Sequence, residues 1–163
     1  NYQVDVSRQM FSHFQTQGRL ERIRPGIYRI AHFPISEHEE LVVAYLWSRE
    51  RGVISHQTAL ALYDLSDARP TSTHLSYPPD KDLPRGQPDW LTLHRARVSD
   101  EDRQWYDVVP ITTPPRTLLD LAAAGFNPDL FFQALDEAEQ QGLVPDDFER
   151  TVILELMTRG GRA

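Results

Sequence analysis

A short segment near the N-terminus carries side chains that can hydrogen-bond to the edges of DNA bases. Its apolar residues Met10, Phe11 and Phe14 recur at helical spacing and mark one face. The other faces are polar and carry Arg8, Gln9, Ser12, His13 and Thr16. An α-helix with its side chains fits the major groove, which is about 12 Å wide, so this helix can present those groups to bases. The N-terminal residues of a recognition helix usually read the bases, which indicates Arg8, Gln9 and Ser12.

Four more arginines follow this segment at short intervals: Arg19, Arg22, Arg24 and Arg29. The pair Pro25-Gly26 is typical of a turn, and β-branched and aromatic residues on both sides of it predict a two-stranded ribbon. Such a ribbon can lie along phosphates or insert one arginine into a narrow minor groove. The sequence therefore places a second group of DNA-binding residues directly after the helix.

The charge distribution separates this region from the rest of the chain. The 163 residues have a formal net charge of -7, which alone argues against nucleic acid as a partner. Residues 1–31, however, hold five arginines against Asp5 and Glu21, a net charge of +3, and the other 132 residues carry -10. A small basic region on an acidic body fits a part that binds phosphate. Five arginines can also form an ordinary solvated surface, and that alternative stays open here.

The elements that position these residues are a capped helix and a ribbon. Ser7 is a favourable N-cap, and Gly18 is a favourable residue for leaving the helix. We interpret residues 1–33 as part of a winged helix-turn-helix. That fold needs a supporting helix before the recognition helix, and residues 1–6 are too short to form one. We therefore expect that this supporting helix is lacking here.

The remaining residues, 34–163, predict a mixed α+β domain with a small antiparallel sheet and C-terminal helices. Predicted helices cover 36–51 with Ser36 as cap, a segment from Ser55, 116–122 with Pro114-Pro115 at its opening, 128–141 and 145–158. Predicted strands cover 73–77, 91–95 and 106–111. Residues 52–66 resemble part of another helix-turn-helix, but Gly52 to Ala68 contains no arginine or lysine, so we expect this segment to belong to the core.

Composition excludes several classes of protein. With 40% hydrophobic and 25% charged residues the chain is close to the globular average. The absence of cysteine excludes a disulfide scaffold and a thiol nucleophile. No apolar run reaches the ~18 residues that span a bilayer, so we expect a cytoplasmic protein with no membrane association. The eight glycines are scattered, without the clustering of a phosphate-binding loop.

Candidate catalytic groups do not form a recognisable set. His38 lacks a second histidine four residues later, and His74 and His94 each stand alone in strand-like segments. Asp136, Glu137 and Glu139 fit a solvated helix face. We predict no enzymatic activity, cofactor or metal, and keep as a minor alternative a hydrolase or nuclease that uses His94 or His74 with nearby acids.

Four segments match a known family in their order along the chain. The first two are the ribbon segment Gly18-Arg19-Leu20-Glu21-Arg22-Ile23-Arg24-Pro25-Gly26-Ile27-Tyr28-Arg29 and the segment Gly52-Val53-Ile54-Ser55-His56-Gln57-Thr58-Ala59-Leu60. The others are Thr73-His74-Leu75-Ser76 and Val109-Pro110-Ile111-Thr112-Thr113-Pro114-Pro115-Arg116-Thr117-Leu118-Leu119-Asp120-Leu121. Over residues 5–145 the chain resembles the AbiEi-type antitoxins of bacterial toxin–antitoxin and phage-defence systems.

The resemblance implies a transcriptional autorepressor whose winged helix binds double-stranded DNA at repeats in its own promoter. It also implies that the α+β domain neutralises a nucleotidyltransferase-like toxin, in many such pairs without a stable complex. The expected DNA-binding residues are Ser7, Arg8, Gln9, Ser12, His13, Arg19, Arg22, Arg24 and Arg29. The alternative is a protein-interaction module that binds a basic partner through its acidic part, residues 129–155, without binding DNA.

Overall fold

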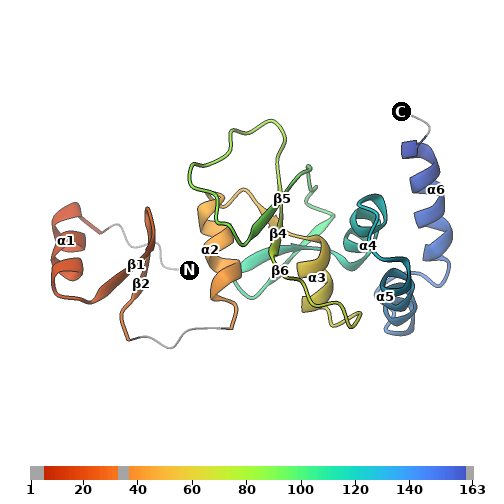
Figure 1. Cartoon of the computed structure of the whole chain (residues 1–163), viewed down its shortest axis with the longest axis horizontal. Coiled ribbons are helices and arrows are strands. Elements are labelled where there is room, and N and C mark those ends of the chain that lie inside the picture. Colours follow the sequence, from red (N-terminus) through yellow and green to blue (C-terminus); the bar gives the residue numbers. More distant parts are fainter. Residues whose placement is uncertain (1–5, 33–36, 161–163) are drawn as a thin grey trace. The chain divides into compact units, whose positions relative to one another are not determined.

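The computed structural model describes residues 6–32 and 37–160 and divides the chain into two compact units, residues 1–39 and 40–163 (Figure 1). The division falls six residues after the predicted boundary between residues 33 and 34. The fold is mixed α+β, as predicted, with one sheet in each unit. No helix among the described residues is both long and apolar enough to cross a membrane.

The first unit consists of one helix and one ribbon. Helix α1 covers Arg8–Thr16, and strands β1, Leu20–Arg24, and β2, Ile27–Ile30, pair antiparallel. Ser7 caps the helix as predicted, because its hydroxyl accepts a hydrogen bond from the Met10 amide at 3.3 Å. Gly26 has φ +81° in the turn between the strands, a conformation that glycine adopts without strain. The predicted helix and ribbon are thus both present.

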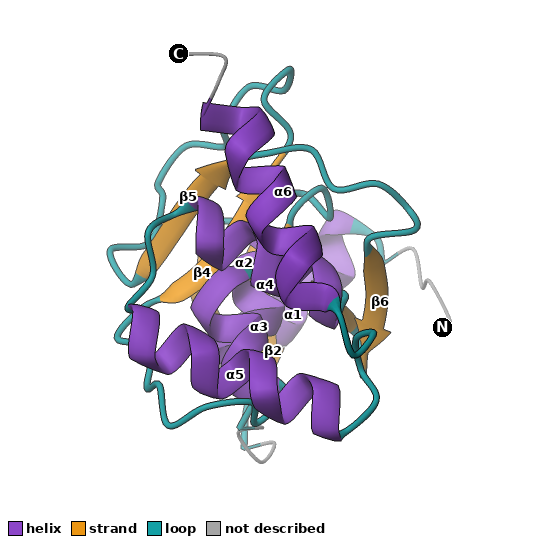
Figure 2. Cartoon of the chain, turned by 90° about the vertical axis from the view of Figure 1, so that its right-hand side faces the viewer, coloured by secondary structure: helices purple, strands orange, loops and turns teal. Residues whose placement is uncertain are grey.

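The second unit contains a five-stranded sheet in the order β5-β4-β3-β7-β6. Its strands are β3 (Val53–Ile54), β4 (Thr73–Tyr77), β5 (Leu91–Arg95), β6 (Arg103–Tyr106) and β7 (Val109–Thr112). Its helices are α2 (Glu39–Trp47), α3 (His56–Leu62), α4 (Pro114–Ala123), α5 (Pro128–Gln140) and α6 (Phe148–Gly160). Within this unit, α2 lies on one side of the sheet and α3 to α6 lie on the other (Figures 1 and 2).

The predicted antiparallel sheet is wrong: the sheet is mixed. Strand β3 pairs parallel with β7, and β4 pairs parallel with β5, whereas β3–β4 and β6–β7 are antiparallel. The single strand predicted over 106–111 is a hairpin, because the chain reverses at Asp107, which has φ +53°. The central strand β3 was not predicted. With two residues it is too short to show the alternation that reveals a strand.

The helix predicted over 36–51 is shorter at both ends. Ser36, its predicted cap, lies outside the described residues. The helix ends at Trp47, where the Ser48 hydroxyl accepts a hydrogen bond from the Gly52 amide at 2.9 Å. Arg49 and Glu50 then take left-handed conformations that turn the chain into β3.

A hydrophobic core between α3, α4, α5 and α6 holds the helical side of the second unit together. It contains Leu60, Leu118, Leu121, Leu135 and Val152, all at most 3% exposed. The predicted interpretation of residues 52–66 as core is confirmed, since His56, Thr58, Ala59 and Leu60 are buried. On α6 the predicted apolar stripe is only partly buried, because Ile153 and Leu156 are exposed.

Candidate functional site

The polar side of α1 faces solvent. Arg8, Gln9, Ser12 and His13 are all exposed, and none of the helix residues is buried. The opposite side contacts the ribbon, where the rings of Phe11 and Tyr28 meet edge to face at a centroid distance of 4.6 Å. The helix therefore separates an aromatic side that anchors it from a polar side that is free of such packing.

The N-terminal end of α1 has a favourable electrostatic environment for an anion. No acidic residue occupies its first turn, so the partial positive charge at this end of the helix is not neutralised by a neighbouring carboxylate there. Arg8 lies in that turn and is exposed. The Ser7 hydroxyl caps the helix, since it accepts the hydrogen bond from the Met10 amide.

The ribbon arginines do not share one face. In the register, Arg22 pairs with Tyr28, whereas Arg24 pairs with Ile27, because a bulge adds one residue to β1 between Arg22 and Arg24. Neighbouring residues of a strand point to opposite faces, so Arg22 lies on the Tyr28 face and Arg24 on the Ile27 face. The ribbon therefore cannot lay all of its arginines along one phosphate backbone.

Arg29 is held within the first unit by two carboxylates. Its guanidinium contacts Glu21 at 2.7 Å and Glu39 at 3.1 Å. The hydrogen bonds that Arg29 donates to Glu21 and Glu39 raise the pKa of Arg29 above its ordinary value. Of the other predicted phosphate ligands, Arg19 and Arg22 are exposed and Arg24 is half-buried. The Arg29 guanidinium is thus engaged by two carboxylates within residues 1–39.

A cluster of three histidines, formed by His56, His74 and His94, lies in the second unit. In the sequence, His74 and His94 each stand alone in a strand-like segment, and His56 belongs to the segment 52–66 that was predicted as core. The rings of His56 and His94 stack with centroids 3.5 Å apart and planes inclined by 10°. The Nδ1 atom of His74 lies 2.9 Å from the Nε2 atom of His94, a hydrogen bond in which one ring donates and the other accepts.

The parallel register of β4 and β5 builds this cluster. His74 pairs with Thr92, and Ser76 pairs with His94, so these four side chains share one polar face of the sheet. His56 begins α3 directly after β3, in a left-handed conformation with φ +52°. Its Nδ1 atom lies 2.9 Å from the hydroxyl of Ser55, which accepts a hydrogen bond from Ser76 at 2.8 Å.

Burial keeps the histidine cluster neutral. Desolvation, with a smaller contribution from the neighbouring histidines, lowers the pKa of His56 from 6.5 to about 3 and that of His74 to about 4. Burial also lowers the pKa of His94, against the opposing charge of Asp120. The three stacked rings, which hydrogen-bond to one another and to hydroxyl groups, thus form a neutral polar cluster.

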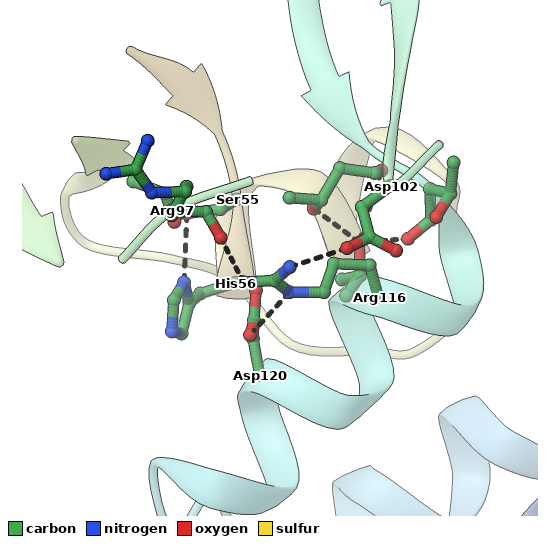
Figure 3. A network of polar contacts seen from close by, with 10 residues as sticks. Ser55, His56, Arg97, Asp102, Arg116 and Asp120 are labelled. Atoms are coloured by element: carbon green, nitrogen blue, oxygen red, sulfur yellow. Dashed lines mark hydrogen bonds and ion pairs between the residues drawn. The ribbon is translucent and has the colours of Figure 1, made fainter. Parts of the chain in front are cut away.

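An ion network on α4 borders the cluster. Arg116 contacts Asp102 at 2.7 Å and Asp120 at 2.9 Å, and it donates a hydrogen bond to the carbonyl of Arg97 at 3.1 Å. Figure 3 shows Arg116 between the two carboxylates, with Ser55 and His56 beside it. Asp120 is buried, so Arg116 supplies the charge that this carboxylate requires. Among residues 6–32 and 37–160, no three ligating side chains are arranged to hold a metal ion.

Comparison with protein-family models found no match, and neither did comparison with curated proteins. Two groups of polar side chains described above differ in their exposure. One is the exposed polar side of α1 with part of the ribbon, and the other is the histidine cluster, in which His56 is buried and His74 and His94 are half-buried. The first presents hydrogen-bonding groups to solvent, whereas the histidine rings contact one another.

Proposed function

We propose that this protein is a DNA-binding antitoxin and transcriptional autorepressor, with DNA bound through α1 of the first unit. The observation that carries the proposal is the set of exposed Arg8, Gln9 and Ser12 on a capped helix whose aromatic side is packed against a ribbon. Arginine bonds bidentately to guanine and glutamine to adenine in the major groove, and serine bonds to either. In this proposal α1 is the recognition helix and the ribbon is the wing of a winged helix-turn-helix.

The geometry of the ribbon distinguishes which of its arginines can contact phosphates. Arg22 is exposed on the Tyr28 face, and Arg19 is exposed at the start of the ribbon. These two are the better candidates for phosphate contacts, since Arg29 is neutralised by Glu21 and Glu39. Arg24 is half-buried on the Ile27 face, so it cannot contact the same phosphates as Arg22.

The antitoxin part of the proposal is supported by the resemblance to AbiEi-type antitoxins. In this proposal the α+β unit neutralises a nucleotidyltransferase-like toxin, and DNA binding by the first unit represses the shared promoter. The two activities lie in different units, which agrees with the division of the chain at residues 39 and 40.

DNA binding is tested by fluorescence anisotropy with the promoter of this protein's own gene and with a scrambled duplex of equal length. We expect Arg8→Ala and Gln9→Ala each to weaken promoter binding by about 1–3 kcal/mol, while binding to the scrambled duplex changes little. Arg150→Ala, which removes an exposed arginine of α6, is the matched control and is expected to have no effect.

Phosphate contacts are distinguished by the salt dependence of the same binding. Arg22→Ala is expected to weaken binding to both duplexes and to reduce the slope of log K against log salt by about 1. Binding to the promoter that does not depend on salt, or that survives Arg8→Ala and Gln9→Ala together, would contradict the proposal.

A further inference from the structure

The second unit has a pocket at the edge of its sheet, separate from the histidine cluster. It lies between α2 and β6, has a volume of about 390 Å³, and is lined by Tyr45, Glu50, Asp100, Arg103, Gln104, Trp105 and Pro110. Trp105 is 67% exposed, the largest exposed fraction among the exposed large hydrophobic side chains of the described residues. Trp105 and Tyr45 thus place two aromatic rings at one pocket.

Two aromatic rings form adjacent walls of this pocket. Tyr45 and Trp105 stand almost perpendicular, at 88°, with their centroids 6.3 Å apart. The negative π faces of such rings attract a cation within about 6 Å, and pairs of aromatic walls recognise ammonium groups in this way. Tyrosine and tryptophan supply this attraction together with apolar surface for the stem of a lysine or arginine.

The charged residues around the rings leave the pocket with an excess of negative charge. Arg103 is paired with Asp100, whereas no described residue forms an ion pair with Glu50. The pKa of Tyr45 is raised by burial and then by the charge of Glu50, whose effect exceeds the opposing effect of Arg103. The whole second unit holds 12 basic and 20 acidic residues, a net charge of -8. Both the charges that line the pocket and the net charge of the whole second unit therefore favour a positively charged ligand.

The edge of the sheet supplies the remaining recognition element. Strand β6 is the last strand of the order β5-β4-β3-β7-β6, and its residues Arg103, Gln104 and Trp105 are exposed. An edge strand pairs with an extended segment through backbone hydrogen bonds, while alternate side chains of that segment enter adjacent pockets.

We propose that this pocket binds a lysine or arginine side chain on an extended basic segment of a partner protein, which adds to the sheet beside β6. Tyr45 and Trp105 contact the cation and its stem, and Glu50 provides the opposite charge. This site differs from residues 129–155, where the sequence suggested that a basic partner would dock. It is independent of DNA binding by α1.

The test is a titration of the intact protein with three capped peptides, followed through the indole N–H signal of Trp105 in NMR spectra. The peptides are Thr-Arg-Thr-Arg-Thr, the same sequence with lysine for arginine, and the same sequence with citrulline, a neutral analogue of arginine. We expect both basic peptides to shift the Trp105 signal and the citrulline peptide to bind about three- to thirtyfold more weakly.

Variants connect the binding to the named residues. Trp105→Leu and Glu50→Gln are each expected to weaken binding of the arginine peptide severalfold. Binding to Glu50→Gln is followed through the Trp105 signal, and binding to Trp105→Leu, which lacks that signal, is measured by calorimetry. The matched controls are Phe132→Leu, which removes an exposed aromatic ring from α5, and Glu101→Gln, which removes an exposed acid outside the pocket; neither is expected to change binding. Equal binding of the citrulline peptide, or no binding of either basic peptide at millimolar concentration, would overturn the proposal.

Discussion

Three features of His56 together constrain its backbone and its side chain. It is 6% exposed, it has a left-handed backbone, and it stacks on a second imidazole. A left-handed conformation costs energy in a residue with a Cβ atom, so the surrounding contacts must hold it. Those contacts are the His94 ring and the Ser55 hydroxyl, which is linked in turn to Ser76.

The neutrality of this residue predicts a loss of stability in acid. Below about pH 6.5 the unfolded chain binds a proton at His56 that the folded chain, with a pKa of about 3, does not. The free energy of unfolding therefore falls as the pH falls through this window, by up to about 1.4 kcal/mol per pH unit for each such histidine. Urea unfolding followed by circular dichroism at a series of pH values measures this slope.

His56→Asn isolates the contribution of this imidazole, because asparagine tolerates the left-handed conformation and does not titrate. We expect the variant to show a shallower fall in stability below pH 6.5 than the parent chain. His32→Asn is the matched control, since His32 is exposed and also left-handed, with φ +61°. The interpretation fails if both variants, or neither, change the slope.

At the scale of elements, the connection from α2 to β3 depends on Gly52. A Cβ atom at this position would lie 2.5 Å from Cδ2 of Leu75 on the neighbouring strand β4, far inside van der Waals contact. The Gly52 amide also donates to the Ser48 hydroxyl, which fixes the glycine in place. Only a residue without a side chain allows the helix end and the sheet to approach this closely.

Gly52→Ala is accordingly expected to destabilise the second unit by about 1–3 kcal/mol, the usual cost of overpacking a core. The double variant Gly52→Ala/Leu75→Ala provides the control, because it removes the side chain that the new methyl group would strike. Urea unfolding should show that the double variant is less destabilised than the sum of the two single variants. Additive effects would show that the clash with Leu75 is not the cause.

The elements also show which features the sequence reveals. Strands β4 and β5 were predicted with their observed bounds, and α4 and α5 begin at Pro114 and Pro128 as their sequences indicate. Strand β3 is too short for a periodicity, and the turn at Asp107 has no glycine or proline to mark it. Local patterns therefore identify long elements and miss short ones whose conformation is imposed by neighbours.

The histidine cluster depends on information that no local pattern contains. Alternation along each strand separates His74 and His94 from their apolar neighbours, but only the parallel pairing of β4 with β5 brings the two rings together. His56 joins them because it follows β3, which is central in the sheet beside β4, and its ring stacks on that of His94. The polar side of α1, by contrast, follows from helical spacing alone, and the structure has those residues exposed as that spacing predicts.

At the scale of the whole molecule, the two units differ in net charge and in the extent of their hydrophobic cores. Residues 1–39 hold five basic and four acidic residues, a net charge of +1, against -8 for residues 40–163. In the first unit Ile27 is the single buried hydrophobic side chain among the described residues, whereas the second unit has an extended core from Leu41 to Val152. A chain of 39 residues with so little buried surface is below the size that usually folds alone.

This difference predicts that the second unit folds without the first. A fragment of residues 37–163 keeps the start of α2 and the hydrogen bond from Thr73 to Glu40, and we expect it to unfold cooperatively at nearly the same urea concentration as the whole chain. A fragment of residues 1–39 is expected to show no cooperative transition, because its core is too small to offset the entropy of ordering the chain. Circular dichroism and fluorescence during urea titration measure both. If residues 37–163 lost their transition, or residues 1–39 retained one, the core of the second unit would not be the source of the chain's cooperativity.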